Sequence, residues 1–200
     1  MALSQDQINA ILEGTGTYDE AGSEGITEEE FAFFQDFSES AMEAGSVAVS
    51  QALGQNVTVS HPELSATDAG LLKEELGNTQ IMIRTGYLTD REYESLLLIK
   101  DYDVAVIFDI LMGKDGRNPD LEISDLQISA IGEVMNQLVG AAATELSRKF
   151  ERKIAMIPPE SQMLDLKQSA LPSGFQNEDL LQVRYHLVIE GVLDSEFFEV

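Results

Sequence analysis

The sequence predicts an α/β protein of the α+β type, in which two long helices pack on one continuous β-sheet and the chain contains an internal duplication. Two long helical patterns, at 27–53 and 124–150, are each followed by strand patterns that contain a proline. The segments 49–63 and 146–160 align without a gap and share a serine, a Val or Ile, and a final Pro-Glu. These observations favour two halves related by a pseudo-two-fold axis.

Residues 1–13 have the pattern of a separate short amphipathic helix. Ser4 and Gln7 have the spacing of a capping box. Residues 14–26 are rich in glycine and acid, which is typical of a flexible linker. The segment is either a frayed or core-docked N-terminal helix, or a peptide that folds in the groove of a partner. Its apolar residues form one stripe: Ile8, Ile11 and Leu12.

We expect a single folded domain over 27–200. Its first helix begins at Thr27, with Glu30 at the capping-box position, and ends near Leu53. The strand that follows is expected to end at Pro62. The apolar residues at helical spacing are Phe34, Phe37, Ala41, Ala44, Ala48 and Ala52. The next elements are a short helix at 71–76, strands at 79–88 and 92–100, and a helix at 101–113.

The second half begins after a loop at 113–122 that has clear turn chemistry. Ser124 and Gln127 form a second capping box, and the helix they begin is expected to reach Phe150. The strand patterns that follow are 153–159, 180–193 and 196–200. Because the chain stops inside a strand pattern and the helix at 101–113 has no counterpart, we expect the natural protein to continue beyond Val200.

The composition excludes several classes of protein. The chain carries 36 Asp and Glu against 12 Lys and Arg, a net charge of −24, so nucleic acid and anionic membranes are poor partners. The acidity either steers a partner with a basic rim or only keeps the protein soluble. There is no cysteine, no membrane-spanning run and no signal peptide, and we expect a cytoplasmic protein. The isolated His61 and His186 and the acids of 113–122 predict no metal or cofactor site.

The second long helix has two stripes on different faces. One is apolar and is expected to face the core: Ile128, Ile131, Met135, Leu138, Ala142 and Leu146. The other consists of Ser129, Glu133, Asn136, Gly140 and Ala143. Asn136 is a poor helix former in mid-helix, and the small Gly140 and Ala143 leave room for another surface. The pattern alone leaves two interpretations open: a solvated face, or a contact surface.

The spacing of this second stripe resembles a family signature. Ser129-x3-Glu133-x2-Asn136-x22-Pro159 matches the pattern Asp/Ser-x3-Glu-x2-Asn-x22-Pro of the CheC/CheX/FliY phosphatase family of bacterial chemotaxis. The surrounding residues 98–147 look like the FliY branch of that family. The N-terminal LSQDQINAIL, which begins at Leu3, resembles the response-regulator-binding peptide of flagellar switch proteins, although Gln7 and Asn9 stand where the family has acids.

The resemblance implies a phosphatase of the flagellar motor switch that acts on the aspartyl phosphate of CheY-P. Asn136 would position the attacking water, Glu133 would anchor the regulator, and Ser129 and Pro159 would support them.

No cofactor is expected on this chain, and Mg²⁺ is expected on CheY. Further implied partners are FliM, FliG and a FliN-like domain or protein. The implied location is the cytoplasmic side of the basal body. The alternative is a non-catalytic rotor scaffold that binds CheY-P. The peptide residues that would contact CheY-P are Leu3, Ser4, Ile8, Ile11 and Leu12.

The first half contains an altered copy of the same pattern. Counting back 22 residues from Pro62 places Glu39 at the Asn position, Asp36 at the Glu position and Ala32 at the Ser position. An ionised Glu39 can only accept hydrogen bonds, and it would repel a phosphoryl group. We therefore expect a degenerate first site.

Overall fold

The computed structural model describes residues 28–76, 79–89, 92–176 and 180–200. The expected peptide at 1–13, the linker at 14–26 and the expected cap at Thr27 lie outside the described residues. No helix within the described ranges is both long and apolar enough to cross a membrane.

Apart from the short turn η1, which was not predicted, the elements occur in the order and of the types that the sequence predicts. They are α2 (Glu28–Leu53), β1 (Val57–Thr67), α3 (Ala69–Leu76), β2 (Thr79–Leu88), β3 (Glu92–Lys100), α4 (Asp101–Leu111), α5 (Asp125–Lys149), β4 (Ala155–Asp165), the 3₁₀ turn η1 (Ser173–Phe175), β5 (Leu180–Ile189) and β6 (Leu193–Glu199). One predicted strand, 180–193, is wrong at its end. A turn in which Gly191 has a φ of 73° separates β5 from β6.

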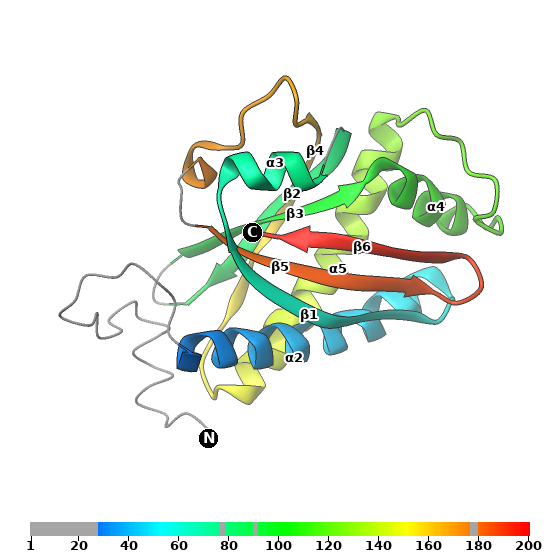
Figure 1. Ribbon diagram of the computed structural model, residues 1–200. Coiled ribbons are helices and arrows are strands. Elements are labelled where there is room, and N and C mark those ends of the chain that lie inside the picture. Colours follow the sequence, from blue (N-terminus) through cyan, green and yellow to red (C-terminus); the bar gives the residue numbers. More distant parts are fainter. Residues whose placement is uncertain (1–27, 77–78, 90–91, 177–179) are drawn as a thin grey trace.

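The sheet has the symmetry that the duplication predicts. Its strand order is β1-β5-β6-β3-β2-β4, and the pairs described are all antiparallel (Figure 1). Exchanging β1, β2 and β3 with β4, β5 and β6 gives the same order read from the other edge. The first strand of each half therefore pairs with the hairpin of the other half, so neither half can form this sheet alone.

One serine in each long helix forms hydrogen bonds with the backbone at the start of the strand that follows. The two serines occupy matching positions in the two halves. Ser50 Oγ accepts a hydrogen bond from the Val57 N–H at 3.0 Å and donates to the Val57 carbonyl at 3.1 Å. Ser147 Oγ accepts from the Ile154 N–H at 3.0 Å and lies 2.9 Å from the Ile154 carbonyl. Ser50 and Ser147 are the serines that the gap-free alignment places together, so the structure confirms the duplication at single residues.

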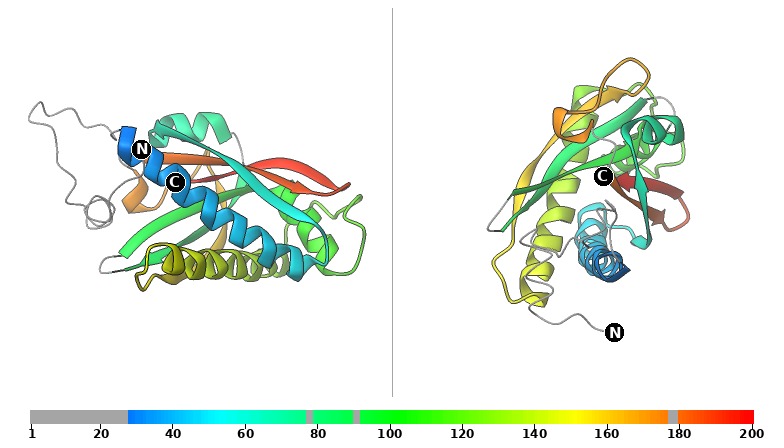
Figure 2. Two further views of the ribbon diagram at one scale, coloured as in Figure 1. Left: turned by 90° about the horizontal axis from the view of Figure 1, so that it is seen from below. Right: turned by 60° about the vertical axis from the view of Figure 1, so that its left-hand side comes forward.

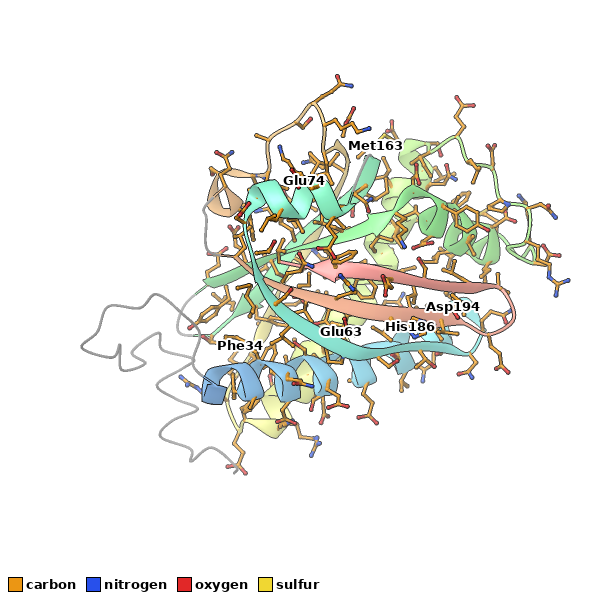
Figure 3. The ribbon with its side chains drawn as sticks, in the orientation of Figure 1. Phe34, Glu63, Glu74, Met163, His186 and Asp194 are labelled. Carbon is orange, nitrogen blue, oxygen red and sulfur yellow. The ribbon has the colours of Figure 1, made fainter. Side chains whose placement is uncertain are left out.

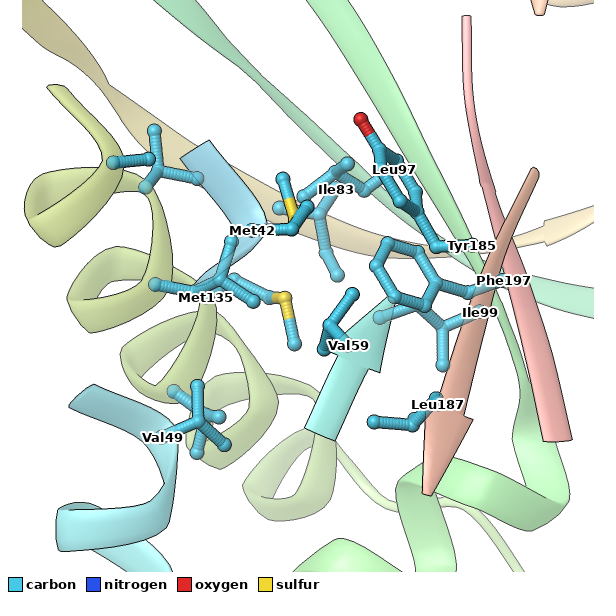
Figure 4. Close-up of a cluster of buried hydrophobic side chains, with 14 of the residues drawn as sticks. Met42, Val49, Val59, Ile83, Leu97, Ile99, Met135, Tyr185, Leu187 and Phe197 are labelled. Carbon is cyan, nitrogen blue, oxygen red and sulfur yellow. The ribbon is translucent and has the colours of Figure 1, made fainter. Parts of the chain in front are cut away.

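The main core lies between the two long helices and one face of the sheet. Figure 2 shows α2 and α5 crossing on the same side of the strands, and Figure 4 shows Met42, Val49 and Met135 of these helices meeting sheet residues such as Leu97 and Phe197. The helices approach closely, because a Cβ atom at Gly45 would lie 2.8 Å from Leu138 Cγ. This contact fixes how α5 is rotated about its axis.

A second, smaller core lies on the opposite face of the sheet, under α3 and η1. It contains Leu72 of α3 and Phe175 of η1. Strand β3 contributes to both cores: Leu97 faces the helices, and Leu98 faces α3. Residues 96–99 of β3 are therefore buried on both sides, which is typical of an unbroken apolar run.

The predicted buried face of α2 is only partly right. Ala41 is buried, but Phe34 and Phe37 only pack at the margin of the core. Larger apolar side chains on an adjacent stripe of α2 determine which face of the helix is buried, because alanines gain little free energy from burial. The fully buried apolar residues of α2 are Phe33, Ala41, Met42, Val49 and Leu53.

The prolines do not end their strands, which is a second correction. Pro158 and Pro159 lie in a β-bulge where the register of β4 on β2 shifts, and β4 continues beyond them. Pro62 lies in the corresponding bulge of β1, where its register on β5 shifts. A bulge leaves residues unpaired, and both strands are at sheet edges, so a missing proline N–H costs little there.

Ser147→Ala should destabilise the fold by about 1–3 kcal/mol, because the Ile154 N–H loses its hydrogen-bond acceptor. Thr144→Ala is the matched control, since the exposed Thr144 only donates to a carbonyl of its own helix. The control should change the free energy of unfolding by about 0.5 kcal/mol or less. Urea denaturation followed by circular dichroism measures both variants, and equal small changes would contradict the fastening role of Ser147.

Candidate functional site

A cleft of about 680 Å³ lies between α5 and β4. It is lined by Ser129, Glu133 and Asn136 from the helix and by Pro159 from the strand. These four residues are the complete pattern identified in the sequence, although 22 residues separate the last two. We call this hollow the α5–β4 cleft.

The start of α5 fixes where these side chains lie. The Ser124 N–H donates to Gln127 Oε1 at 2.7 Å, and the Gln127 N–H donates to Ser124 Oγ at 3.4 Å. This confirms the predicted capping box. The apolar stripe of α5 is buried from Ile131 to Leu146, so the helix cannot rotate and Glu133 has to face the cleft.

Asn136 is half-buried, and its Oδ1 atom is shielded from solvent and accepts no hydrogen bond from any described residue. Ser161 Oγ of β4, in the wall of the same cleft, is also shielded and unpaired. Buried polar atoms normally have partners, because an unpaired one costs about 1–3 kcal/mol. Rotation of either side chain would bring a polar atom into the cleft, where it could bond to a water molecule or to a polar group of a ligand.

The sequence analysis missed Ser161 and Gly132. A Cβ atom at Gly132 would lie 2.8 Å from Ser161 Oγ. Glycine at this position therefore lets α5 approach β4 with the serine hydroxyl between them. Strand alternation could have identified the serine, since residues 159, 161 and 163 share one face of an extended strand.

Ser129 and Glu133 are the accessible polar groups of the cleft. Both side chains are exposed, and Glu133 makes no ion pair with any described residue. A free carboxylate on the rim can accept hydrogen bonds from a cationic group of a partner. The apolar Met163 of β4, labelled in Figure 3, lines the same cleft and is 45% exposed.

The expectation that Gly140 and Ala143 leave room for a partner is wrong. Ala143 is buried in the main core, and a Cβ atom at Gly140 would lie 3.5 Å from Met156 Sδ of β4. The space beside this part of the stripe is occupied by the chain itself. Only the N-terminal part of the stripe, from Ser129 to Asn136, opens onto the cleft.

The described residues contain no group of three His, Asp or Glu side chains that could hold a metal ion. His186 lies on β5 and contacts Asp194 of β6 at 2.6 Å, away from the cleft (Figure 3). Among the described residues, Asp125 and Glu133 are the only carboxylates that line the cleft. The cleft therefore has too few ligands for a protein-bound divalent ion of the usual kind.

The first half does not repeat this geometry. Asp36 forms an ion pair of 2.6 Å with Lys149 of α5, which also donates to Ser40 Oγ at 2.6 Å. Glu39 is exposed, and Pro62 is buried in its bulge. The alignment that pairs the two prolines places Gln35 at the position of Gly132 and Leu64, which packs on the core, at the position of Ser161.

A comparison with protein families supports the same segment of the chain. A model of the CheC-like family matches residues 126–162, the stretch that contains the four pattern residues and Ser161. This match and the full-length likenesses that follow agree, and the chain is similar to proteins of the CheC-like family.

The chain is similar to flagellar FliY proteins over most of its length. The flagellar motor switch phosphatase FliY of Bacillus subtilis (strain 168) is 28% identical over 203 residues, which cover 99% of this chain and 54% of that protein. The chain therefore spans about half the length of this curated relative. The crystal structure of Thermotoga maritima FliY is also 28% identical, with a TM-score of 0.80 over 86% of this chain and 89% of that chain.

The fold also occurs in another switch protein assembly. A chain of the FliG–FliM complex from H. pylori matches with a TM-score of 0.68 at 16% identity, covering 87% of this chain and 93% of that chain. At this identity the likeness shows the fold alone.

The contact between Gly132 and Ser161 generates a prediction about stability. In a Ser161→Ala background, Gly132→Ala should stabilise the protein by up to about 1 kcal/mol, the gain in helix propensity. In the wild-type background the new methyl group meets the hydroxyl, so the gain should be smaller by about 0.5 kcal/mol or more. A double-mutant cycle by urea denaturation measures this difference, and an additive cycle would show that the close approach is absent.

Proposed function

We propose that this chain is a phosphatase that hydrolyses the aspartyl phosphate of CheY-P in the α5–β4 cleft. The observation that carries the proposal is the convergence of Ser129, Glu133, Asn136 and Pro159 on one hollow. The phosphatase name of the 28% identical FliY supports the same reaction class.

An aspartyl phosphate is an acyl phosphate, so its hydrolysis needs no covalent nucleophile from the enzyme. It needs a water molecule held in line with the scissile P–O bond. The amide of Asn136 can accept a hydrogen bond through its oxygen and donate through its nitrogen. A half-turn of the terminal amide exchanges these two atoms, so either can face the cleft. Asn136 is therefore our candidate for the group that orients the water.

Glu133 and Ser129 would dock the regulator. The free, exposed carboxylate of Glu133 suits an ion pair with a lysine at the regulator's active site. Ser129, one turn earlier on α5, offers a hydroxyl on the same rim. Pro159 shapes the wall, because its bulge redirects β4 beneath the helix. The Mg²⁺ ion needed for phosphoryl transfer would be held by CheY.

We further propose that the chain works at the cytoplasmic side of the flagellar motor, with FliM, FliG and FliN-like partners. The likeness to FliY proteins supports this location. The net charge of −24 favours partners with basic surfaces over nucleic acid.

A binding-only scaffold is the second candidate function. The altered first half favours it, because Asp36 is held by Lys149 and Glu39 replaces the amide. A scaffold would bind CheY-P without increasing its rate of phosphate loss. Phosphate release from excess CheY-P with catalytic amounts of the chain separates the two functions.

Asn136→Ala should slow dephosphorylation by about tenfold or more, which corresponds to about 1.4 kcal/mol of barrier. The substitution removes a buried oxygen that has no partner, so the free energy of unfolding should not fall. Single-turnover phosphate release measures the rate, and circular dichroism confirms the fold. A wild-type rate in this variant would remove Asn136 from the reaction and leave the scaffold.

Glu133→Ala should lower activity mainly by weakening the binding of CheY-P. Raising the concentration of CheY-P should therefore restore much of its rate, whereas it should not restore the rate of Asn136→Ala. Steady-state kinetics over a wide range of CheY-P concentrations separate KM from kcat. An unchanged KM with a reduced kcat would assign Glu133 to the chemical step instead.

Glu39→Ala is the matched control at the aligned position of the first half. Glu39 is exposed and does not line the α5–β4 cleft, so turnover should stay within about twofold of wild type, equivalent to about 0.4 kcal/mol. The same phosphate-release assay measures it. A large loss of rate would show that the first half takes part in hydrolysis.

A further inference from the structure

The molecule has a second hollow, of about 290 Å³, at the first turns of α2. Its walls include Phe33, Phe34 and Phe37 of α2, Tyr93 of β3 and Leu180 of β5. We call it the α2 groove. Phe34 marks it in Figure 3, well away from Met163 of the α5–β4 cleft. It is apolar, whereas the cleft is rich in polar groups.

The one carboxylate at the floor of the α2 groove that belongs to β6, Glu199, already has a hydrogen-bond partner within the protein. Glu199 of β6 accepts a hydrogen bond from the Tyr185 hydroxyl at 2.9 Å, and burial raises the pKa of this carboxyl. Both effects reduce the tendency of the floor to bind a cation. The groove is therefore suited to an apolar occupant.

The pseudo-two-fold symmetry identifies the shape of that occupant. Helix α4 packs against α2, α5, β2, β3 and β6. Exchanging the two halves converts these elements into α5, α2, β5, β6 and β3, and all of them except α5 line the α2 groove. The groove therefore corresponds to most of the seat of α4.

The contacts of α4 show what such a seat accepts. Val104, Ile107 and Ile110 of this 11-residue helix are buried in the main core. Asp103 at its start accepts a hydrogen bond from Ser195 of β6 at 2.7 Å. A short helix with apolar residues at i, i+3 and a polar first turn therefore fits this geometry.

We propose that residues 3–12 of this same chain dock in the α2 groove as a short helix. Ile8 and Ile11 have the i, i+3 spacing of Val104 and Ile107, and Leu12 widens the same stripe. Ser4 and Gln7 supply the polar first turn. A helix this short is not stable alone in water, so it needs a surface that covers its apolar side.

The connecting chain is long enough for this docking. Residues 13–27 can span up to about 50 Å when extended. Phe33 and Phe34 lie within the first two turns of α2, about 10 Å from its start. A tether of this length gives an effective concentration in the millimolar range. A dilute external helix would therefore compete poorly for the groove.

Residues 3–12 would use the same apolar stripe to dock in the α2 groove and to bind a partner. The two contacts therefore exclude each other. A partner of the N-terminal segment would first have to displace it from the α2 groove. This inference does not depend on phosphatase chemistry in the α5–β4 cleft.

Disulfide trapping in the full-length chain tests the docking, because the sequence contains no cysteine. Ile11→Cys is combined with Tyr93→Cys, at a groove residue that is 36% exposed. The matched control combines Ile11→Cys with Tyr102→Cys, at a tyrosine of α4 that is 45% exposed and outside the groove. The first pair should form an intramolecular disulfide at least about tenfold faster than the control, and independently of protein concentration.

A third substitution tests whether the apolar stripe drives the docking. Added to the first pair, Ile8→Ser should remove the rate advantage, whereas Gln7→Ser on the polar side should retain it. If Tyr93→Cys fails to fold, Leu180→Cys provides a second groove position. Equal rates for the groove and control pairs would overturn the proposal. Covalent dimers as the main product would overturn it in favour of a second copy of the chain as occupant.

Discussion

The close packing of α2 on α5 is the constraint on which the rest of the structure depends. Gly45 of α2 leaves room for Leu138 of α5, and this contact sets the rotation of α5 above the sheet. With its apolar stripe buried, α5 has to present Glu133 and Asn136 toward β4. Gly132 then lets the helix approach Ser161 closely enough to form a polar cleft. The site is therefore a consequence of how the core is packed.

The duplication explains why two similar halves can carry different surfaces. The serines that fasten each helix to its strand and the bulges that hold the prolines occur in both halves. These features maintain the sheet, and neither half can form it alone. The surface positions have diverged, since Asp36 pairs with Lys149 where Glu133 is free. Among the described residues, helix α4 covers one of the two corresponding seats and no helix covers the other.

The sequence was sufficient to predict the elements, their order and the pattern residues of the cleft, because periodicity, capping and motif spacing are local signals. It was not sufficient where contacts between distant segments decide. The continuation of β4 past Pro159 depends on a bulge against β2. The close approach of Gly132 to Ser161 appears only when helix and strand are brought together. Ala143 is buried by core residues from other elements, and the sequence pattern of α5 alone does not show these contacts.

The most direct test of the central claim is a crystal structure of this chain bound to CheY that carries beryllium fluoride as a phosphate mimic on its aspartate. The account predicts that the mimic faces the α5–β4 cleft, with the Asn136 amide within about 3.5 Å of the mimic or of a water in line with it. Glu133 should contact a cationic side chain of CheY. A complex that places the mimic over α2, or leaves Asn136 outside the interface, would contradict the account.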